Sequence, residues 1–203
     1  MKSLSEIETT VKRASKAAGY SWGVSEETAK SIRLLELFSL PGVKHLNKYF
    51  IEKKIKKFEN LKLINKSNSS TNDPYCPITL GVSFLDQINI LEKIKKIEFT
   101  NVAYPVIFLS FISRSSEIIG KKIYVKIDEK KILLNLNVNI NLSFIDNEFP
   151  KIANIIEVKL IENEDNFTDD EWNNLYKLSE DTFVEESNSL KEGAAGAGLT
   201  DND

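Results

Sequence analysis

Few residue types in this sequence could do chemistry, and the first to consider are its single cysteine and single histidine, Cys76 and His45. A thiol beside an imidazole is the smallest nucleophile–base pair. Nothing in the sequence brings the two together, and an isolated cysteine is usually a small buried hydrophobic residue. One cysteine and one histidine also cannot build a zinc site without several carboxylates. The sequence therefore predicts no metal site and identifies no cofactor.

A charged group on a predicted helix is the second candidate. Glu27, Lys30 and Arg33 recur every three residues in the run EETAKSIR. At this spacing they form ordinary helix-surface pairs worth about 0.2–0.5 kcal/mol each. The alternative is a cluster at the mouth of a pocket, where Arg33 binds a carboxylate through two hydrogen bonds.

The segment GYSWG, residues 19–23, directly precedes this helix. Free amides at a helix N-terminus can hold a carboxylate or phosphate, which would make Trp22 and Gly23 binding residues. A tight turn between two helices, with Trp22 buried, is the structural alternative.

The C-terminal segment EGAAGAGLTDND is the last candidate. Its glycines, including Gly196 and Gly198, have no predicted strand before them and no helix after them, so they do not form a dinucleotide-binding motif. Asp201 and Asp203 could carry protons or hold a hard cation, although two carboxylates in a short segment are weak support for a site.

Helices are predicted for the first third of the chain. Ser3 and Glu6 form a capping box before an apolar stripe that runs to a stop at Gly19. A second helix is expected from an N-cap at Ser25 to residue 40, and a third over residues 43–58, with Leu46, Phe50 and Ile55 inward and a lysine-rich outer face. Residues 65–73, NKSNSSTND, are typical of a polar loop.

The middle of the chain changes to the two-residue period of strands. Residues 76–81 are expected to form a buried turn or short strand before a helix over 83–93. Strands are predicted over 94–102, 105–113, 121–127, 131–142 and 155–162. The second of these is apolar on both faces and is expected to be central. The alternation is complete over residues 134–144, where an asparagine ladder could bind a sugar, although a solvated sheet face is the simpler explanation.

Thr168 is expected to cap a last helix, with Trp172, Leu175 and Leu178 facing inward. The order of elements predicts an α+β fold, in which an N-terminal helical layer packs on an antiparallel sheet and a C-terminal helix and a Gly-rich acidic tail follow. A single domain over residues 1–192 would hold the helices at about 4–58, the loop 65–73, the sheet region at about 76–162 and the helix at about 168–182. Residues 193–203 would be the tail.

Composition excludes several classes of protein. The chain has 203 residues, of which 41% are hydrophobic and 28% charged, so it can bury an ordinary core. No apolar run is long enough to span a membrane, no secretory signal is recognisable, and one cysteine allows no internal disulfide. We expect a soluble cytoplasmic protein with no membrane association.

Charge is segregated along the chain. Residues 1–66 have fourteen Lys/Arg against seven Asp/Glu, whereas residues 157–203 have three basic against fourteen acidic residues. Opposite charges attract over roughly 8–10 Å at ordinary salt, so the acidic C-terminal part is expected to associate with the basic N-terminal helices. Nucleic acid is not an expected partner, because the net charge is -3 and the lysines are not interleaved with exposed aromatic residues.

Three segments together resemble a family of bacterial proteins of unknown function, DUF3726. They are KRASKAAGYSWGVSEETAKSIRLLE, CPITLG with Asp86, and TFVEESNSLKEGAAGAGLTDND. The resemblance carries no established activity. It implies that the tail, whose composition is unsuited to packing, acts at a site.

Two functions are consistent with these observations. The first is a binding or accessory module whose Gly-rich acidic tail docks on a basic helical site, in its own domain or on a protein partner. The alternative is a small-molecule enzyme acting on a small anionic ligand. Its pocket would lie between the GYSWG turn, the CPITLG segment, which contains Cys76 and Gly81, and the tail.

Overall fold

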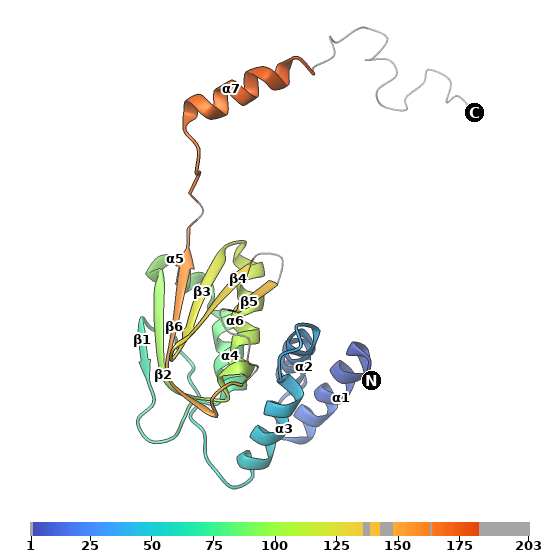
Figure 1. Ribbon diagram of the computed structural model, residues 1–203. Helices are drawn as coiled ribbons and strands as arrows, with labels where there is room; N and C mark the ends of the chain where they lie inside the picture. Colours follow the sequence, from blue (N-terminus) through green and yellow to red (C-terminus); the bar gives the residue numbers. More distant parts are fainter. Residues whose placement is uncertain (1, 136–138, 143–147, 163, 183–203) are drawn as a thin grey trace, which may run out of the picture. The chain divides into compact units, whose positions relative to one another are not determined.

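The computed structural model describes residues 2–135, 139–142, 148–162 and 164–182, and it confirms the α+β class (Figure 1). Within these residues the chain forms seven helices and a six-stranded, mostly antiparallel sheet. It divides into two compact units, residues 1–163 and 164–203, and each is described by itself below. The predicted boundary between residues 192 and 193 lies outside the described residues.

The three N-terminal helices form as predicted, with shifted ends. They are α1 (Leu4–Ala17), α2 (Trp22–Leu37) and α3 (Gly42–Lys53). The N-cap of α2 is Ser21 rather than Ser25, since the Ser21 hydroxyl accepts the amide of Val24 at 3.3 Å. Because α3 ends at Lys53, Ile55 lies beyond the helix and is 80% exposed, so its predicted inward position is wrong.

The sheet has the strand order β1-β2-β6-β3-β4-β5. Its strands are β1 (Ser67–Ser69), β2 (Lys96–Ala103), β3 (Lys122–Ile127), β4 (Lys130–Asn135), β5 (Asn139–Leu142) and β6 (Ile152–Ile161). All neighbours pair antiparallel except β1 and β2, which are parallel. The strands predicted over 94–102, 121–127 and 155–162 are confirmed with small shifts.

Two predictions in the sheet region are wrong. The single strand expected over 131–142 is a pair of antiparallel strands, β4 and β5, in which Leu134 lies opposite Ile140. A two-residue alternation is the same before and after such a reversal, so it cannot reveal the turn. The loop 65–73 contains β1, which pairs with β2 in parallel, and the side-chain amide of the buried Asn68 also donates to the Glu98 carbonyl at 3.1 Å.

The largest error concerns residues 105–113, which belong to helix α6 (Pro105–Ile119) and not to a central strand. Pro105 occupies the first turn, where its missing amide costs nothing, and Gly120 ends the helix with φ of 62°. Residues 104–113 are all buried. An apolar run without alternation fits a helix enclosed on all sides as well as it fits a central strand. The predicted central position of this segment is correct, although its secondary structure is not.

Helix α6 separates the N-terminal helices from the sheet. One side of α6 packs on β3 and β4, and other sides pack on α2, α3 and α4 (Pro77–Asp86). Residues 76–81 are therefore mostly helical and not a turn or strand, and the helix predicted over 83–93 is divided between α4 and the short α5 (Asn89–Ile94). The helical layer contains more than the three N-terminal helices.

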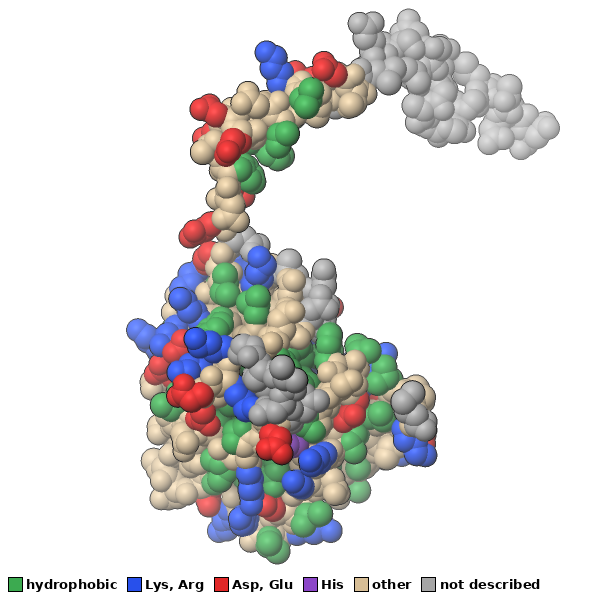
Figure 2. Space-filling view, in the orientation of Figure 1, with side chains coloured by type: hydrophobic (Ala, Val, Ile, Leu, Met, Phe, Trp, Pro, Cys, Tyr) green, Lys and Arg blue, Asp and Glu red, His purple; other side chains and the backbone are tan. Residues whose placement is uncertain are grey.

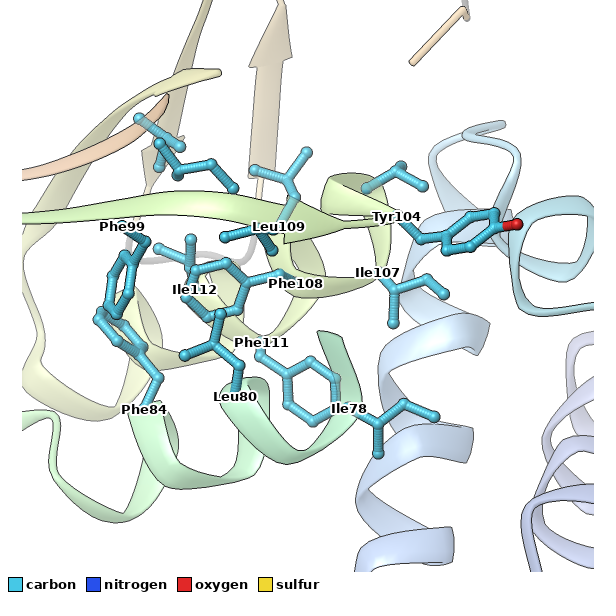
Figure 3. Packing of buried hydrophobic residues seen from close by; sticks show 14 of the residues in the cluster. Ile78, Leu80, Phe84, Phe99, Tyr104, Ile107, Phe108, Leu109, Phe111 and Ile112 are labelled. Atoms are coloured by element: carbon cyan, nitrogen blue, oxygen red, sulfur yellow. The ribbon is translucent and has the colours of Figure 1, made fainter. Parts of the chain in front are cut away.

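The core centres on three phenylalanines from α4, β2 and α6 (Figure 3). Phe84, Phe99 and Phe108 meet edge to face, with ring centroids 5.2–6.1 Å apart. Tyr104 points away from this cluster in Figure 3. It has a left-handed backbone, with φ of 46°, and immediately precedes α6.

The second unit contains α7 (Asp169–Glu180), which begins with the predicted cap at Thr168. Thr168 and Glu171 form a reciprocal capping box. No residue of α7 is buried, and Trp172, Leu175 and Leu178 are 54–65% exposed. Their expected inward packing is thus not present in the described structure.

Candidate functional site

The predicted charged cluster on α2 joins helices to one another. The guanidinium of Arg114 on α6 pairs with the Glu27 carboxylate and donates to the Glu27 carbonyl and the Ser31 hydroxyl at 3.2 Å each. Burial alone would raise the pKa of Glu27, but hydrogen bonds from Arg114 and Lys30 outweigh it and lower that pKa. Arg33 pairs with Glu8 of α1 at 3.4 Å. None of these groups lines a pocket described below.

The GYSWG turn contributes one residue to a pocket, and it is Tyr20. Trp22 is 57% exposed, so its expected burial is wrong, and the Lys16 ammonium lies 5.5 Å from its ring centroid. Gly23 faces open space, with no atom within 4 Å of the position of an added Cβ.

The remaining predicted residues divide into packing positions and undescribed ones. Gly81 lies against the Phe111 ring, where an added Cβ would be 2.3 Å from Cδ2, so Gly81 permits α4 to approach α6. Asp86 is exposed at the end of α4. Gly196, Gly198, Asp201 and Asp203 lie outside the described residues.

Cys76 is buried at the N-cap of α4 in a cluster of hydroxyl and thiol groups. Its Sγ lies 2.9 Å from Tyr49 Oη and 3.5 Å from Tyr20 Oη, and the two phenol oxygens are 2.8 Å apart. The amide of Thr79 points to the sulfur at 3.4 Å. Burial raises the pKa of both tyrosines above the ordinary value of a phenol. Both tyrosines are therefore neutral and can each donate one hydrogen bond.

This cluster borders a pocket of about 490 Å³ with a basic wall. Lys53, Lys56 and Lys57 line it, and Lys53 also lies over the Tyr20 ring at 4.9 Å. His45 lines a different pocket, so Cys76 and His45 do not form the nucleophile–base pair that the sequence raised as a possibility.

The site that sequence reasoning missed lies on the other side of α3. A pocket of about 520 Å³ is lined by Lys44, His45, Lys48, Ile51, Glu52, Tyr104, Glu148, Phe149 and Lys151. A second pocket of about 380 Å³ shares Glu52, Tyr104 and Lys151 with it and extends to Ile55, Lys56 and Lys57. We call Lys44, Lys48, Ile51, Ile55, Lys56, Lys57 and Lys151 the α3 surface.

His45 is the buried polar group of this site. It is 7% exposed, its ring meets Tyr104 edge to face at 5.9 Å, and its Nδ1 has no hydrogen-bond partner among the described residues. Burial, reinforced by the charges of Lys48 and Lys44, lowers the pKa of His45 to about 4. At neutral pH the imidazole is uncharged, so the positive potential of the pocket comes from lysines.

Glu52 and Tyr104 brace the pocket where α3 approaches the start of β6. Lys151 pairs with the Glu52 carboxylate, and its hydrogen bond is the main reason that the pKa of Glu52 is lowered. Burial and a hydrogen bond with Glu52 raise the pKa of Tyr104 to about 12. The Tyr104 amide donates to the Lys151 carbonyl at 2.7 Å, which fixes the left-handed residue.

Lys44 and Lys48 are two cations that line the larger pocket of the site. Both are exposed, and neither has an ion pair within the described ranges, whereas Lys151 is paired. Figure 2 shows the histidine, in purple, between basic and acidic side chains. Ammonium groups beside an uncharged imidazole and a phenol can bind carboxylates or phosphates. The part of the chain that the structure describes contains no group of three residues able to hold a metal ion.

The sequence signals for this site were incomplete. The lysine-rich outer face of the third helix was visible from its periodicity. Tyr104 and Lys151 lie more than fifty residues away from α3, and no spacing connects them to it. The strand predicted over 105–113 also hid the position of Tyr104, because this residue lies beside His45 only when a helix follows it.

Comparison with known proteins supports the resemblance for the first of the three segments, and the other two segments lie outside the match. The profile of the family described as "Protein of unknown function (DUF3726)" matches residues 2–75. These residues include α1 to α3, and therefore Lys44, His45 and Lys48. Searches of curated proteins and of solved structures give no match. Across the described ranges, no helix has both the length and the apolar character needed to cross a membrane. The N-terminal segment over residues 2–75 is thus similar to the DUF3726 family.

Proposed function

We propose that this chain is a binding module whose α3 surface takes an acidic polypeptide segment. The observation that carries the proposal is the pair of exposed lysines, Lys44 and Lys48, beside a 520 Å³ pocket that contains the uncharged, partly unsatisfied His45. Carboxylates on a bound segment would offer both lysines the partner that they lack in the described residues. Ile51, which is 56% exposed, adds apolar contact area.

The acidic C-terminal part of this chain has the chemistry of such a ligand. Residues 183–203 contain five acidic residues and one basic residue, Lys191. They also contain three glycines. Glycines allow close approach of a backbone to a surface, and the carboxylates of Glu185, Glu186, Asp201 and Asp203 complement lysines. The family resemblance of this segment supports a role at a site. We therefore propose residues 183–203 as the ligand, in the same chain or in another.

A binding titration tests this proposal. A labelled peptide of residues 183–203 is added to the chain lacking residues 183–203, so that the chain's own segment does not compete. The double substitution Lys44→Glu and Lys48→Glu is expected to weaken binding about tenfold or more, because each lost pair costs about 0.5–1 kcal/mol and each new charge repels. Fluorescence anisotropy measures the affinity.

The control is Lys62→Glu, which changes an exposed lysine outside the α3 surface. It is expected to leave the affinity within about twofold of the parent, since distant exposed charges are screened by salt. Equal binding by all three proteins, or no binding by any, would refute the proposal.

A second function is supported by the Cys76 pocket. The structure brings Tyr20 of the GYSWG turn within 3.5 Å of Cys76 of the CPITLG segment, in a pocket with three lysines. We propose as the alternative that this pocket binds a small anion with Cys76 as a nucleophile. The Thr79 amide and the phenol of Tyr49 lie within hydrogen-bond reach of the Cys76 sulfur, at 3.4 Å and 2.9 Å.

A thermal-shift screen of small organic anions and phosphates tests the alternative. A ligand at 100 times its dissociation constant stabilises the folded state by about 2.7 kcal/mol. The expected result is a compound whose shift disappears in Cys76→Ala and persists in Lys44→Glu. A screen in which every active compound stabilises both variants equally, or in which no compound acts, rejects a site at Cys76.

A further inference from the structure

Helix α7 presents an apolar face that no described residue of its own unit covers. The face consists of Phe167, Trp172, Leu175, Tyr176 and Leu178, which are 47–65% exposed. Phe167 stacks on Trp172 with ring centroids 5.6 Å apart, so the face is locally organised. A helix of twelve residues is marginal in water without tertiary contacts. The capping box contributes only about 1 kcal/mol, so the helix needs a surface against which to bury this face.

The charges of α7 define that surface. Asp169, Asp170, Glu171 and Glu180 oppose the single Lys177 in the helix. A complementary surface has an apolar stripe between basic side chains. A second α7 does not meet this description, because its own carboxylates would repel.

The α3 surface meets it. Ile51 and Ile55 are 56% and 80% exposed and lie four residues apart, as do Trp172 and Tyr176. Lys44 and Lys48 line the same pocket as Ile51, and Lys56 lines the same pocket as Ile55. The α3 surface and α7 thus have opposite charges and a pair of apolar residues at the same interval.

The length of the connection favours α7 from another molecule. Lys151, at the start of β6, contacts Glu52 on α3, whereas α7 follows the opposite end of that strand. Ten strand residues span roughly 33 Å, and the seven residues 162–168 span at most about 25 Å. The extended connection is shorter than β6, so docking on the α3 surface of its own chain would require a nearly fully extended connection. A helix from a second copy has no such limit.

We infer that α7 of one copy docks on the α3 surface of a second copy, and that reciprocal docking forms a dimer. The inference rests on the proposed function in one respect, since the same surface receives the acidic ligand. It adds a defined partner, which is a second copy of this chain, and a defined element, which is the apolar face of α7. Exchange of identical elements between two copies gives closed twofold symmetry.

Analytical ultracentrifugation of the full chain over a range of concentrations tests the inference. The expected result is a reversible monomer–dimer equilibrium. Leu175→Ser on α7 and Ile55→Ser beside α3 are each expected to raise the dimer dissociation constant at least tenfold. Both residues are exposed, so neither substitution removes core packing. Leu63→Ser, at a residue that is 65% exposed and outside both surfaces, is the matched control and should dimerise like the parent.

Mixing the two variants provides a second test. The Leu175→Ser chain retains an intact α3 surface, and the Ile55→Ser chain retains an intact α7, so a mixture restores one of the two contacts. The mixture is expected to dimerise more tightly than either variant alone. A parent that is monomeric at every concentration, or a dimer that neither substitution weakens, overturns the inference. If the Lys44→Glu, Lys48→Glu protein still loses peptide binding in that case, only the dimer is wrong and the proposed function stands.

Discussion

Replacing Gly81 by alanine is expected to lower the free energy of unfolding by about 3 kcal/mol. The added Cβ would lie 2.3 Å from Cδ2, 2.4 Å from Cγ and 2.7 Å from Cε2 of Phe111. Phe111 is completely buried and belongs to the same core cluster as Phe84 and Phe108, so its ring cannot move without displacing other side chains. Urea denaturation monitored by circular dichroism measures the change.

The matched control is Gly23→Ala, because Gly23 is also a helical glycine and was also predicted as a site residue. An alanine there meets no atom within 4 Å and has a helical backbone. It is expected to raise stability by up to about 1 kcal/mol, the difference in helix propensity. Similar stabilities for the two variants would show that α4 and α6 do not approach as closely as described.

Acid is expected to destabilise the protein through His45. The folded-state pKa of His45 is lowered to about 4 from its ordinary 6.5. Between these values the unfolded chain binds a proton that the folded chain does not. The contribution of the neutral His45 to the free energy of unfolding is therefore fully present above about pH 6.5. It is lost as the pH falls towards 4. The loss amounts to about 3 kcal/mol, because each unit of pKa difference is worth 1.36 kcal/mol.

His45→Phe isolates this effect, since phenylalanine cannot bind a proton and can retain the edge contact with Tyr104. Denaturation midpoints are compared at pH values from about 7.5 to 4.5. Glu27 and Glu52 have lowered pKa values, so their contributions are lost only below this range. The parent is expected to lose most of the 3 kcal/mol, and the variant much less. An equal loss in both proteins would mean that His45 is not held neutral by its surroundings.

Local signals in the sequence predicted much of the fold correctly. Capping residues located α1 and α7, and alternation located β2, β3 and β6, because each feature depends on residues that are close in sequence. The strand prediction for residues 105–113 was wrong for a physical reason. A helix enclosed on every side is apolar all round, and its period is invisible. The Pro105 and Gly120 signals at its two ends were the available clue.

The candidate site was less accessible to sequence reasoning than the fold. Glu27, Lys30 and Arg33 have the composition of a site, yet Glu27 and Arg33 pair with Arg114 and Glu8 of other helices. Lys30 pairs with Glu26 within α2. Whether a charged side chain faces a pocket or a neighbouring helix depends on tertiary contacts that no local spacing encodes. The lysine-rich character of the third helix was correct, but the convergence of Tyr104 and Lys151 on it was not foreseeable.

The single histidine allows a direct test of acidic-segment binding at the α3 surface. His45 gives one imidazole Cε1–H resonance, and it lies in the pocket between Lys44 and Lys48. The peptide 183–203 is added at pH 7 to the chain lacking residues 183–203, and proton NMR follows this resonance. A saturable shift that high salt abolishes, and that is absent in the Lys44→Glu, Lys48→Glu protein, is the predicted result. A His45 resonance that stays in place while the peptide binds elsewhere would contradict the account.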